Sequence, residues 1–358
     1  MFPNLALWAR LLLAAAVAFA ASFLSTPPVK RFAEAIGAID VPKDERRVHK
    51  EPVPRMGGLA IFIGFVLSLL LFTETLSTPI VGLLLGAVII AVMGAIDDII
   101  NLNAWVKLAG QILAAGVAIR CGIVIDAISN FTPAGGTTFF GSNWLSIAVT
   151  MFWIVACTNA VNLIDGLDGL AVGVSTISSL TMLVVSLYVA NPAVSLILAA
   201  LTGACIGFLP YNMNPAKIFM GDVGSQTLGF VLSTASILGM FKFHAIISFL
   251  VPLLALAVPL ADTIFAFVRR IAHGQSPFHA DRGHFHHRLL ALGMGQKRAV
   301  AVLYGISAVL GLIAVLMAAQ SVAMRIVCIV AAFLISITVW LMVLRIIPRQ
   351  PKEKREEK

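Results

Sequence analysis

Charged residues are scarce in this sequence. Only 12% of its 358 residues are Asp, Glu, Lys or Arg, whereas 59% are hydrophobic, and the mean hydropathy is +0.98. This composition excludes a soluble domain and indicates an integral membrane protein. Cysteine is scarce too. The four cysteines are scattered through or beside apolar stretches and form no C-x-x-C pair, so they read as small packing residues rather than a disulfide or zinc framework.

Apolar runs recur along the whole length, each long enough to cross about 30 Å of hydrocarbon as a helix. They predict an all-α polytopic membrane protein with about eleven transmembrane helices, at 5–25, 58–73, 79–96, 104–120, 144–161, 169–190, 194–211, 224–240, 245–267, 299–319 and 325–346. We expect one transmembrane domain, 1–346, and a charged tail, 347–358. The turn residues and β-branched runs of 121–143 favour a short hairpin there.

Basic residues gather on alternate predicted loops, and loops rich in Lys and Arg stay in the cytoplasm. The opposite face keeps little beyond Arg120, Lys242 and Arg325. We therefore expect the N-terminus outside, the C-terminus in the cytoplasm, and cytoplasmic loops at 26–57, 97–103, 162–168, 212–223 and 268–298. The net charge of +8 suits this orientation and anionic lipid headgroups, and it requires no nucleic-acid partner.

Nine of the ten aspartates fall on the predicted cytoplasmic side. Acidic residues at a membrane boundary are costly and usually mark a functional site. A shared cleft would bring together those at the ends of four separate predicted spans: Asp97 and Asp98, Asp165 and Asp168, Asp222, and Asp262. Converging carboxylates tolerate one another around a divalent cation, and Mg²⁺ prefers oxygen ligands and usually also binds substrate phosphates. The pattern predicts a diphosphate substrate held through magnesium.

The stretch NLIDGLDGLAVG, residues 162–173, holds three of the candidate site residues. Asn162, Asp165 and Asp168 are spaced i, i+3, i+6, which predicts that they lie along one face at a helix start, where the helix dipole favours negative groups. Glycines at similar spacing would allow a ligand or another helix to approach the backbone closely. The alternative is an acidic helix start with small packing residues.

Two further segments carry aspartates. In GAIDDIINLN, Asp97 and Asp98 point about 100° apart on a helix, so we expect them to have different roles. In NMNPAKIFMGDVGSQ, a glycine-flanked Asp222 opens a predicted helix, where backbone N–H groups can receive an anion or the carboxylate can bind a metal. G-D-x-G alone is a weak signal, and solvated acids at helix ends are the plain alternative.

The segment HADRGHFHHRLLALG, residues 279–293, combines four histidines with Arg282 and Arg288. A zinc site fits poorly because no thiol is nearby, and a plain basic cluster does not explain the histidines. Recognition of a nucleotide or phosphate by Arg and His is the preferred interpretation. VHKEPVPRMGG places Lys50 and Arg55 before the second predicted span, where simple positive-inside charge is an equal alternative.

These segments together resemble the bacterial polyprenyl-phosphate N-acetylhexosamine-1-phosphate transferases of glycosyltransferase family 4. The matches PRMGG, the Asp-Asp pair, NLIDGLDGLA, FMGD-x-GS, PLADT and HADRGHFHHRL occur in the family's order between about residues 45 and 290. The histidine-rich segment resembles the branch that serves teichoic-acid linkage units or O-antigen more than the muramoyl-pentapeptide branch. The sugar, the downstream polymer and the oligomeric state stay open, with a homodimer among the possibilities.

The resemblance implies transfer of N-acetylglucosamine 1-phosphate from UDP-N-acetylglucosamine to undecaprenyl phosphate, with release of UMP, at the cytoplasmic face of the bacterial plasma membrane. It implies Mg²⁺, with Mn²⁺ as a possible substitute. By motif, the implied roles are as follows: Asp97 and Asp98 catalytic, Asn162 and Asp222 metal ligands, Asp165, Asp168, Asn212, Arg282, His284 and His286 on the nucleotide sugar, and Lys50 and Arg55 on the lipid phosphate. Because a phosphate monoester is already mostly dianionic near neutral pH, Asp97 could serve only to position it.

Two functions of other classes compete with this interpretation. An intramembrane aspartyl protease would use two aspartates at membrane depth, and Met220-Gly221-Asp222 faintly resembles such a motif. An ion-coupled transporter would explain ionisable residues within spans, but it predicts them near mid-bilayer and on both faces, whereas here they crowd one side.

Overall fold

The computed structural model describes residues 6–41, 51–125, 127–130, 136–139, 143–240, 245–272 and 285–319, and a few positions between 327 and 334. Twelve helices are seen in these ranges: α1 Leu7–Ala35, α2 Gly58–Phe72, α3 Thr78–Ile100, α4 Ala104–Arg120, α5 Asn143–Leu163, α6 Leu170–Tyr188, α7 Pro192–Asn212, α8 Gly221–Met240, α9 Ala245–Ala255, α10 Ala257–Ala272, α11 Phe285–Ala291 and α12 Gln296–Ala319.

Strands are few and short. Strand β1 (Ile39–Asp40) pairs antiparallel with β2 (Val53–Pro54), and β3 (Ala127–Asn130) pairs antiparallel with β4 (Gly136–Phe139). The second pair confirms the hairpin expected within 121–143. The chain is therefore a helical membrane protein, as its composition predicts.

Six described helices are long and apolar enough to cross a membrane: α1, α3, α5, α6, α7 and α12, with α2 as a shorter apolar helix. The prediction of about eleven spans is confirmed only in this coarser form. The last predicted span, 325–346, lies almost wholly outside the described residues, and the tail 347–358 lies outside them entirely.

Two predicted spans have different bounds in the structure. Helix α1 continues through Pro27 and Pro28 to Ala35, so the first long loop is shorter than 26–57. The span expected at 245–267 is two helices, α9 and α10, which divide at Leu256. Pro259 has no N–H to offer the carbonyl of Ala255 four residues earlier, and Ser178 Oγ donates to that carbonyl instead (2.5 Å).

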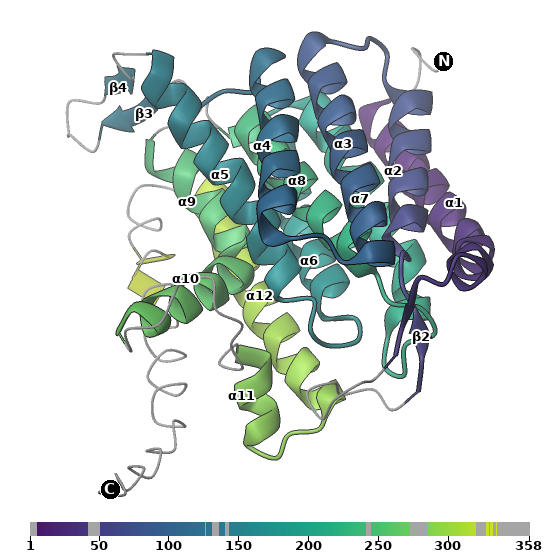
Figure 1. Cartoon of the computed structure of the whole chain (residues 1–358). Helices are drawn as coiled ribbons and strands as arrows, with labels where there is room; N and C mark the ends of the chain where they lie inside the picture. The colour runs from purple at the N-terminus through teal and green to yellow at the C-terminus, as the bar shows by residue number, and fades with distance from the viewer. Residues whose placement is uncertain are drawn as a thin grey trace, which may run out of the picture.

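The helices form one bundle (Figure 1), in which α7 packs against α1, α2, α6 and α8. Of its most apolar window 78% is buried, against 22% for α1, which lies at the side of the bundle. Helices α3, α4, α5 and α8 pack side by side, and α10 runs obliquely across the lower end of the bundle in Figure 1. Because α3 descends and α4 ascends in this view, their connection lies at the lower end.

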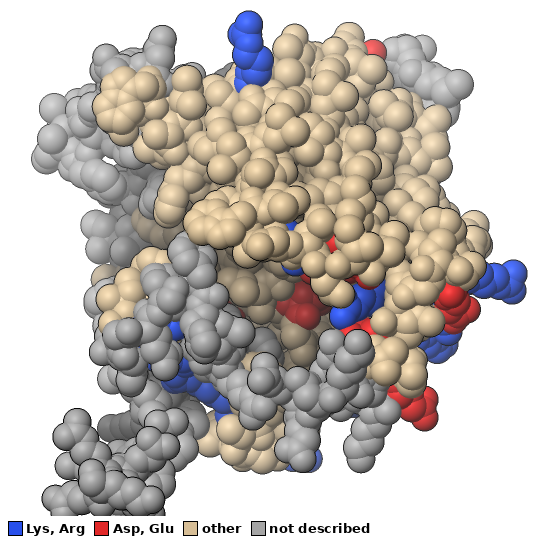
Figure 2. Space-filling view, in the orientation of Figure 1, with Lys and Arg blue, Asp and Glu red and all other residues tan. Residues whose placement is uncertain are grey.

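Charged side chains gather toward that lower end. In Figure 2 the upper half of this face is almost uniformly uncharged, whereas Lys, Arg, Asp and Glu are visible in and around a hollow in the lower half. A bundle with one nearly uncharged part and one charged end fits a protein that presents its polar end at a membrane surface.

Candidate active site

The start of α8 is held by an aspartate from another helix. Asp98 lies in the last turn of α3, and its carboxylate accepts hydrogen bonds from the backbone N–H of Asp222 (2.9 Å) and of Val223 (3.2 Å). These are free donors of a helix N-terminus, which a carboxylate satisfies well. Asp98 is buried, with 5% of its surface exposed. Both of its oxygens are therefore committed to fixing the residue that follows Gly221.

Close packing of glycines makes this contact possible. A Cβ on Gly221, whose φ is +72°, would lie 2.3 Å from Asp98 Oδ2, so only glycine fits between the two helices. A Cβ on Gly58 would lie 2.0 Å from Gly224 Cα, which brings the PRMGG and FMGD segments together. Backbone bonds from Gly57 N to Phe219 O (2.9 Å) and from Gly58 N to Met220 O (2.8 Å) join the same two segments.

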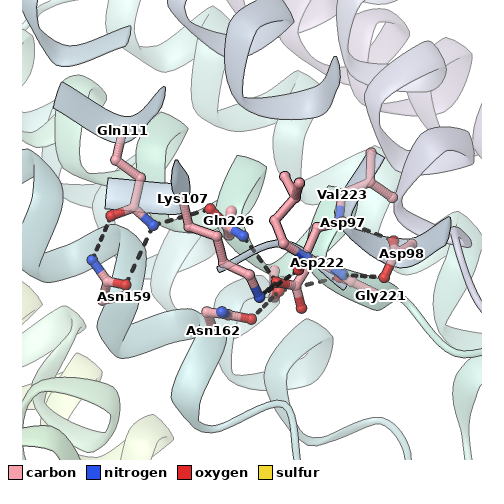
Figure 3. A network of polar contacts seen from close by, with 12 residues as sticks. Asp97, Asp98, Lys107, Gln111, Asn159, Asn162, Gly221, Asp222, Val223 and Gln226 are labelled. Carbon is pink, nitrogen blue, oxygen red and sulfur yellow. Dashed lines mark hydrogen bonds and ion pairs between the residues drawn. The ribbon is translucent and has the colours of Figure 1, made fainter. Parts of the chain in front are cut away.

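Lys107 of α4 lies between two aspartates (Figure 3). Its ammonium forms ion pairs with Asp97 Oδ2 of α3 and with Asp222 Oδ2 of α8, the latter at 2.8 Å. Asp97 also accepts a bond from the backbone N–H of Leu102 (2.5 Å). Three helices thus bring two carboxylates and one ammonium to one point. As expected, Asp97 and Asp98 point to different partners, but both lie within α3 rather than in the predicted loop 97–103.

Asn162 and Asp165 adjoin this cluster. Asn162, in the last turn of α5, accepts a hydrogen bond at Oδ1 from Ser225 Oγ of α8 (2.7 Å). Asp165 lies in the turn that follows. Burial, and then the like charges of Asp222, Asp98 and Asp168, raise the pKa of Asp165 to about 8. The negative charge of the cluster therefore reaches Asp165, and a cation bound there would favour its ionised form.

The predicted helical face of Asn162, Asp165 and Asp168 is wrong. Helix α5 ends at Leu163, α6 begins at Leu170, and residues 164–169 form turns, because Gly166 and Gly169 (φ +77°) interrupt the helix. Only Asn162 is helical. The loops predicted at 162–168 and 212–223 are correspondingly shorter, because α7 continues to Asn212 and α8 begins at Gly221.

Asp168 and Asn212 tie this turn to the loop after α7. Asp168 Oδ2 accepts bonds from Asn214 Nδ2 (2.8 Å) and from the backbone N–H of Ala216 (3.1 Å). Asn212, 2% exposed, accepts from the N–H of Gly169 (3.1 Å) and donates to the carbonyl of Ile218 (3.0 Å). Their polar atoms thus hold protein groups, and the contact to a nucleoside inferred by motif stays a prediction.

Arg55 lies beside the start of α2 and forms an ion pair with Asp40 (2.6 Å between Nη2 and Oδ1). Burial lowers the pKa of the guanidinium, but the bond and charge of Asp40, together with the charges of Asp98 and Asp222, outweigh this and raise it. Arg55 thus interacts electrostatically with the acidic cluster and keeps its positive charge near it. Lys50, expected to share its role, lies outside the described residues.

The histidine-rich segment is described only from Phe285 onward. Arg282 and His284 lie outside the described residues, as does the side chain of His286, whose backbone belongs to α11. The backbone N–H of Phe285 donates to Asp262 of α10 (2.6 Å), and the guanidinium of Arg288 lies 4.2 Å from the centre of the Phe265 ring. Asp262 therefore accepts a hydrogen bond from the first residue of α11 in this structure.

The donors around Lys107 suit a hard cation. Within the described ranges, no three His, Cys, Asp or Glu side chains lie close enough to hold a metal by themselves. Magnesium, however, is usually bound by one or two carboxylates, with waters and substrate phosphates completing its shell. Asp97 and Asp222 already share a positive group, and Asn162 adds an amide oxygen nearby. These residues fit a Mg²⁺ that a diphosphate would help to bind.

Residues 80–240 match the family model described as glycosyl transferase family 4. A probable undecaprenyl-phosphate N-acetylglucosaminyl 1-phosphate transferase of Bacillus subtilis is 41% identical over 86% of this chain and 86% of its own length. The chain belongs to this family. A decaprenyl-phosphate N-acetylglucosaminephosphotransferase of Mycobacterium tuberculosis is 37% identical over 79% of this chain and 76% of its own length. A phospho-N-acetylmuramoyl-pentapeptide-transferase of Desulforudis audaxviator is 30% identical over 84% and 96%.

The segment that matches the family model contains the whole cluster around Lys107, whereas Arg55 and α11 lie outside it. Sequence reasoning found the aspartates but missed Lys107, although a lysine inside an apolar helix is a signal for a functional site. It also missed Gln111, four residues later on the same face of α4, and Gln226 of α8. Polar residues within predicted spans would have indicated both.

Proposed function

We propose that this membrane protein transfers N-acetylglucosamine 1-phosphate from UDP-N-acetylglucosamine to a polyprenyl phosphate, with undecaprenyl phosphate as the expected acceptor. Membership of glycosyl transferase family 4 and the relatives named for this reaction support the proposal. The observation that carries it is the cluster in which Lys107 joins Asp97 and Asp222 at the charged end of an apolar bundle. A lipid phosphate and a soluble nucleotide sugar can meet only at such a boundary.

The chemistry asks little of the protein beyond position and charge. A phosphate oxygen of the lipid attacks the sugar-linked phosphorus of the nucleotide sugar, the bond to the UMP oxygen breaks, and one phosphoanhydride replaces another. Catalysis then consists of aligning the two phosphates and offsetting the charge that develops. Bound Mg²⁺ would supply positive charge to the diphosphate, with Asp222 and Asn162 as the residues that would hold it.

The residues of the chain take distinct parts in this scheme. Asp97 orients the attacking phosphate. The ammonium of Lys107, which pairs with two carboxylates in the free protein, also interacts with the phosphates once they bind. Asp98 positions α8 and thereby Asp222, so it is a positioning residue, although both acids of the pair were expected to be catalytic. Arg55, whose charge already faces the cluster, would meet the lipid phosphate.

The orientation belongs to the same proposal. Arg55 lies near Asp98 and Asp222, and Lys297 and Arg298 are in the first turn of α12, whose Gln296 accepts a hydrogen bond from Asn214 in the loop before α8. The positive-inside rule then places this end in the cytoplasm, where nucleotide sugars are made, and the membrane is the bacterial plasma membrane.

The two competing functions lose their support in this structure. An aspartyl protease uses two carboxylates without a cation paired to them, whereas here one ammonium forms ion pairs with both Asp97 and Asp222. A transporter is expected to carry ionisable residues on both faces, whereas the cluster lies at one end of the bundle. Neither function is represented among the relatives described above, which are all named as transferases.

The test is UMP release by the purified protein in detergent with Mg²⁺, undecaprenyl phosphate and UDP-N-acetylglucosamine. We expect release that requires both substrates and stops when EDTA removes the cation. A panel of UDP-N-acetylhexosamines, assayed in parallel, determines the sugar. Release of UMP without the lipid would indicate a hydrolase, and no release with any sugar would overturn the proposal.

A further inference from the structure

Three amide side chains continue the polar cluster into the interior of the bundle (Figure 3). Gln226 lies one turn after Asp222 on α8, Gln111 one turn after Lys107 on α4, and Asn159 one turn before Asn162 on α5. Gln226 and Gln111 are buried, with 0% and 2% of their surfaces exposed. Burying an amide within an apolar bundle is costly unless its hydrogen bonds are made, so a linked set of three calls for an explanation.

Three hydrogen bonds of these amides lead step by step toward Asp222, and one bond returns, from Gln111 Nε2 to Asn159 Oδ1 (3.3 Å). Asn159 Nδ2 donates to Gln111 Oε1 (2.6 Å), Gln111 Nε2 donates to Gln226 Oε1 (3.0 Å), and Gln226 Nε2 donates to Asp222 Oδ2 (3.0 Å). Asn159 Nδ2 also donates to the backbone carbonyl of Val155 (2.8 Å).

Both ends of this chain are pure acceptors, a carbonyl oxygen and a carboxylate. The carbonyl of Val155 requires the NH₂ group of Asn159 to point toward it, and the following amides then have one satisfied arrangement. The NH₂ group of Gln226 is thereby fixed toward Asp222. The NH₂ groups of Gln111 and Gln226 both point along the chain toward the carboxylate, and buried hydrogen bonds linked in this way strengthen one another.

The amide chain fixes the orientation of the Asp222 carboxylate. Its Oδ2 receives two donors, Gln226 Nε2 and Lys107 Nζ, from different helices, which fixes the plane of the carboxylate. Neither of these two donors reaches Oδ1, the other oxygen of the same group, and the side chain of Asp97 also lies within hydrogen-bond distance of this carboxylate. Lys107 and Gln226 therefore hold the carboxylate by one oxygen, and neither of them occupies the other.

We propose that Asn159, Gln111 and Gln226 form an amide relay, a set of positioning residues that holds Asp222 by one oxygen and aims the other at the divalent cation of the transfer reaction. The relay rests on the proposed function for its purpose, but its physical effect, a fixed Asp222, is a property of the protein alone. It begins at α5, beyond the charged cluster, and acts on the cation only through Asp222.

The test replaces each amide by an apolar side chain of similar size, as Gln226→Met, Gln111→Met and Asn159→Leu. Cation affinity is measured by titrating the purified protein with Mn²⁺ and recording free Mn²⁺ by electron paramagnetic resonance, with and without UDP-N-acetylglucosamine. Gln226→Met should weaken Mn²⁺ binding by about 10-fold, as expected for loss of a hydrogen bond to a charged group. Gln111→Met and Asn159→Leu should weaken it progressively less.

The decisive observation is whether the losses add. Because the three amides act through one contact, Gln111→Met should cost little further affinity in a Gln226→Met background. Fully additive losses, unchanged Mn²⁺ affinity in the single variants, or no Mn²⁺ binding by the wild-type protein in either condition would each overturn the relay. The Mg²⁺ concentration for half-maximal UMP release should rise in parallel, whereas KM for the lipid should not.

A matched control is Ser179→Ala, which removes an equally buried polar pair, Ser179 with Thr202 (2.9 Å), between α6 and α7. It should leave Mn²⁺ affinity and UMP release unchanged. If the double variant fails to fold, Asn159→Leu decides, because Asn159 is the least buried member and makes no contact with Asp222. A wild-type protein that binds Mn²⁺ through the relay but releases no UMP would overturn the proposed function and leave the relay intact.

Discussion

At the start of α8, the carboxylates of Asp97 and Asp222 face one ammonium group, that of Lys107, whereas in the turn before α6 the carboxylate of Asp168 faces amide and backbone N–H groups. The first arrangement leaves negative charge and an oxygen for a ligand. The second satisfies the carboxylate with the protein's own donors and fixes a loop. Aspartates at membrane-boundary helix ends therefore serve two purposes, and their partners distinguish them.

Asp98 shows that the two purposes can occur in adjacent residues. It lies next to Asp97 in α3, yet it caps α8 with both oxygens. The charged cluster and the loop-fixing acids are thus interleaved along the chain. Substitutions that remove charge while keeping shape should separate them, since a ligand-binding carboxylate loses activity and a structural one loses stability.

The largest effect is expected for Asp222→Asn. Asparagine keeps the shape and one acceptor oxygen for Lys107 and Gln226, but it removes the charge that a cation requires. UMP release should fall by about 10²–10³-fold or more, as for loss of a preorganised electrostatic contact. The thermal unfolding midpoint should stay within the range of the wild-type protein, since the packing at Gly221 and Gly224 is untouched. Substantial turnover by a folded variant would remove Asp222 from the cation site.

Asp98→Asn should combine a smaller loss of activity with a loss of stability. The amide NH₂ would face the backbone N–H of Asp222 or Val223, so one buried donor of the helix start is left unpaired. The expected cost in the free energy of unfolding is about 1–3 kcal/mol. Thermal unfolding in detergent, with Asp97→Asn as the matched neighbour, measures it. Equal stability of the two variants would contradict the capping role of Asp98.

Much of this architecture follows from the sequence. Apolar runs predict the membrane helices because each must be long enough to cross hydrocarbon. The crowding of aspartates at one predicted face indicates where a functional site lies. That Asp97, Asp98 and Asp222 come together could be expected on charge alone, because scattered buried acids would each need a separate partner.

Other features depend on packing between distant segments and have no local signal. The contact of Gly58 with Gly224 joins positions far apart in the chain, and the cap of α8 comes from α3 rather than from a neighbouring residue. The i, i+3, i+6 spacing of Asn162, Asp165 and Asp168 predicts a helix, whereas Gly166 and Gly169 make residues 164–169 a turn. At the break before α10, the carbonyl of Ala255 has no N–H donor at Pro259. It accepts from Ser178 Oγ, a residue of another helix that the local sequence does not indicate.

The smallest and sharpest effect is expected at Asp168, where two roles make opposite predictions. If Asp168 fixes the loop after α7, Asp168→Asn should keep most activity, because an amide oxygen can still accept from Asn214 and Ala216. Asp168→Ala should instead lower the free energy of unfolding by about 1–3 kcal/mol through the unpaired donors. If Asp168 binds the nucleoside, Asp168→Asn should raise KM for UDP-N-acetylglucosamine while leaving stability unchanged. Steady-state kinetics and thermal unfolding of both variants decide between them. A structural role predicts that Asp168→Ala is less stable than Asp168→Asn and that Asp168→Asn keeps the wild-type KM.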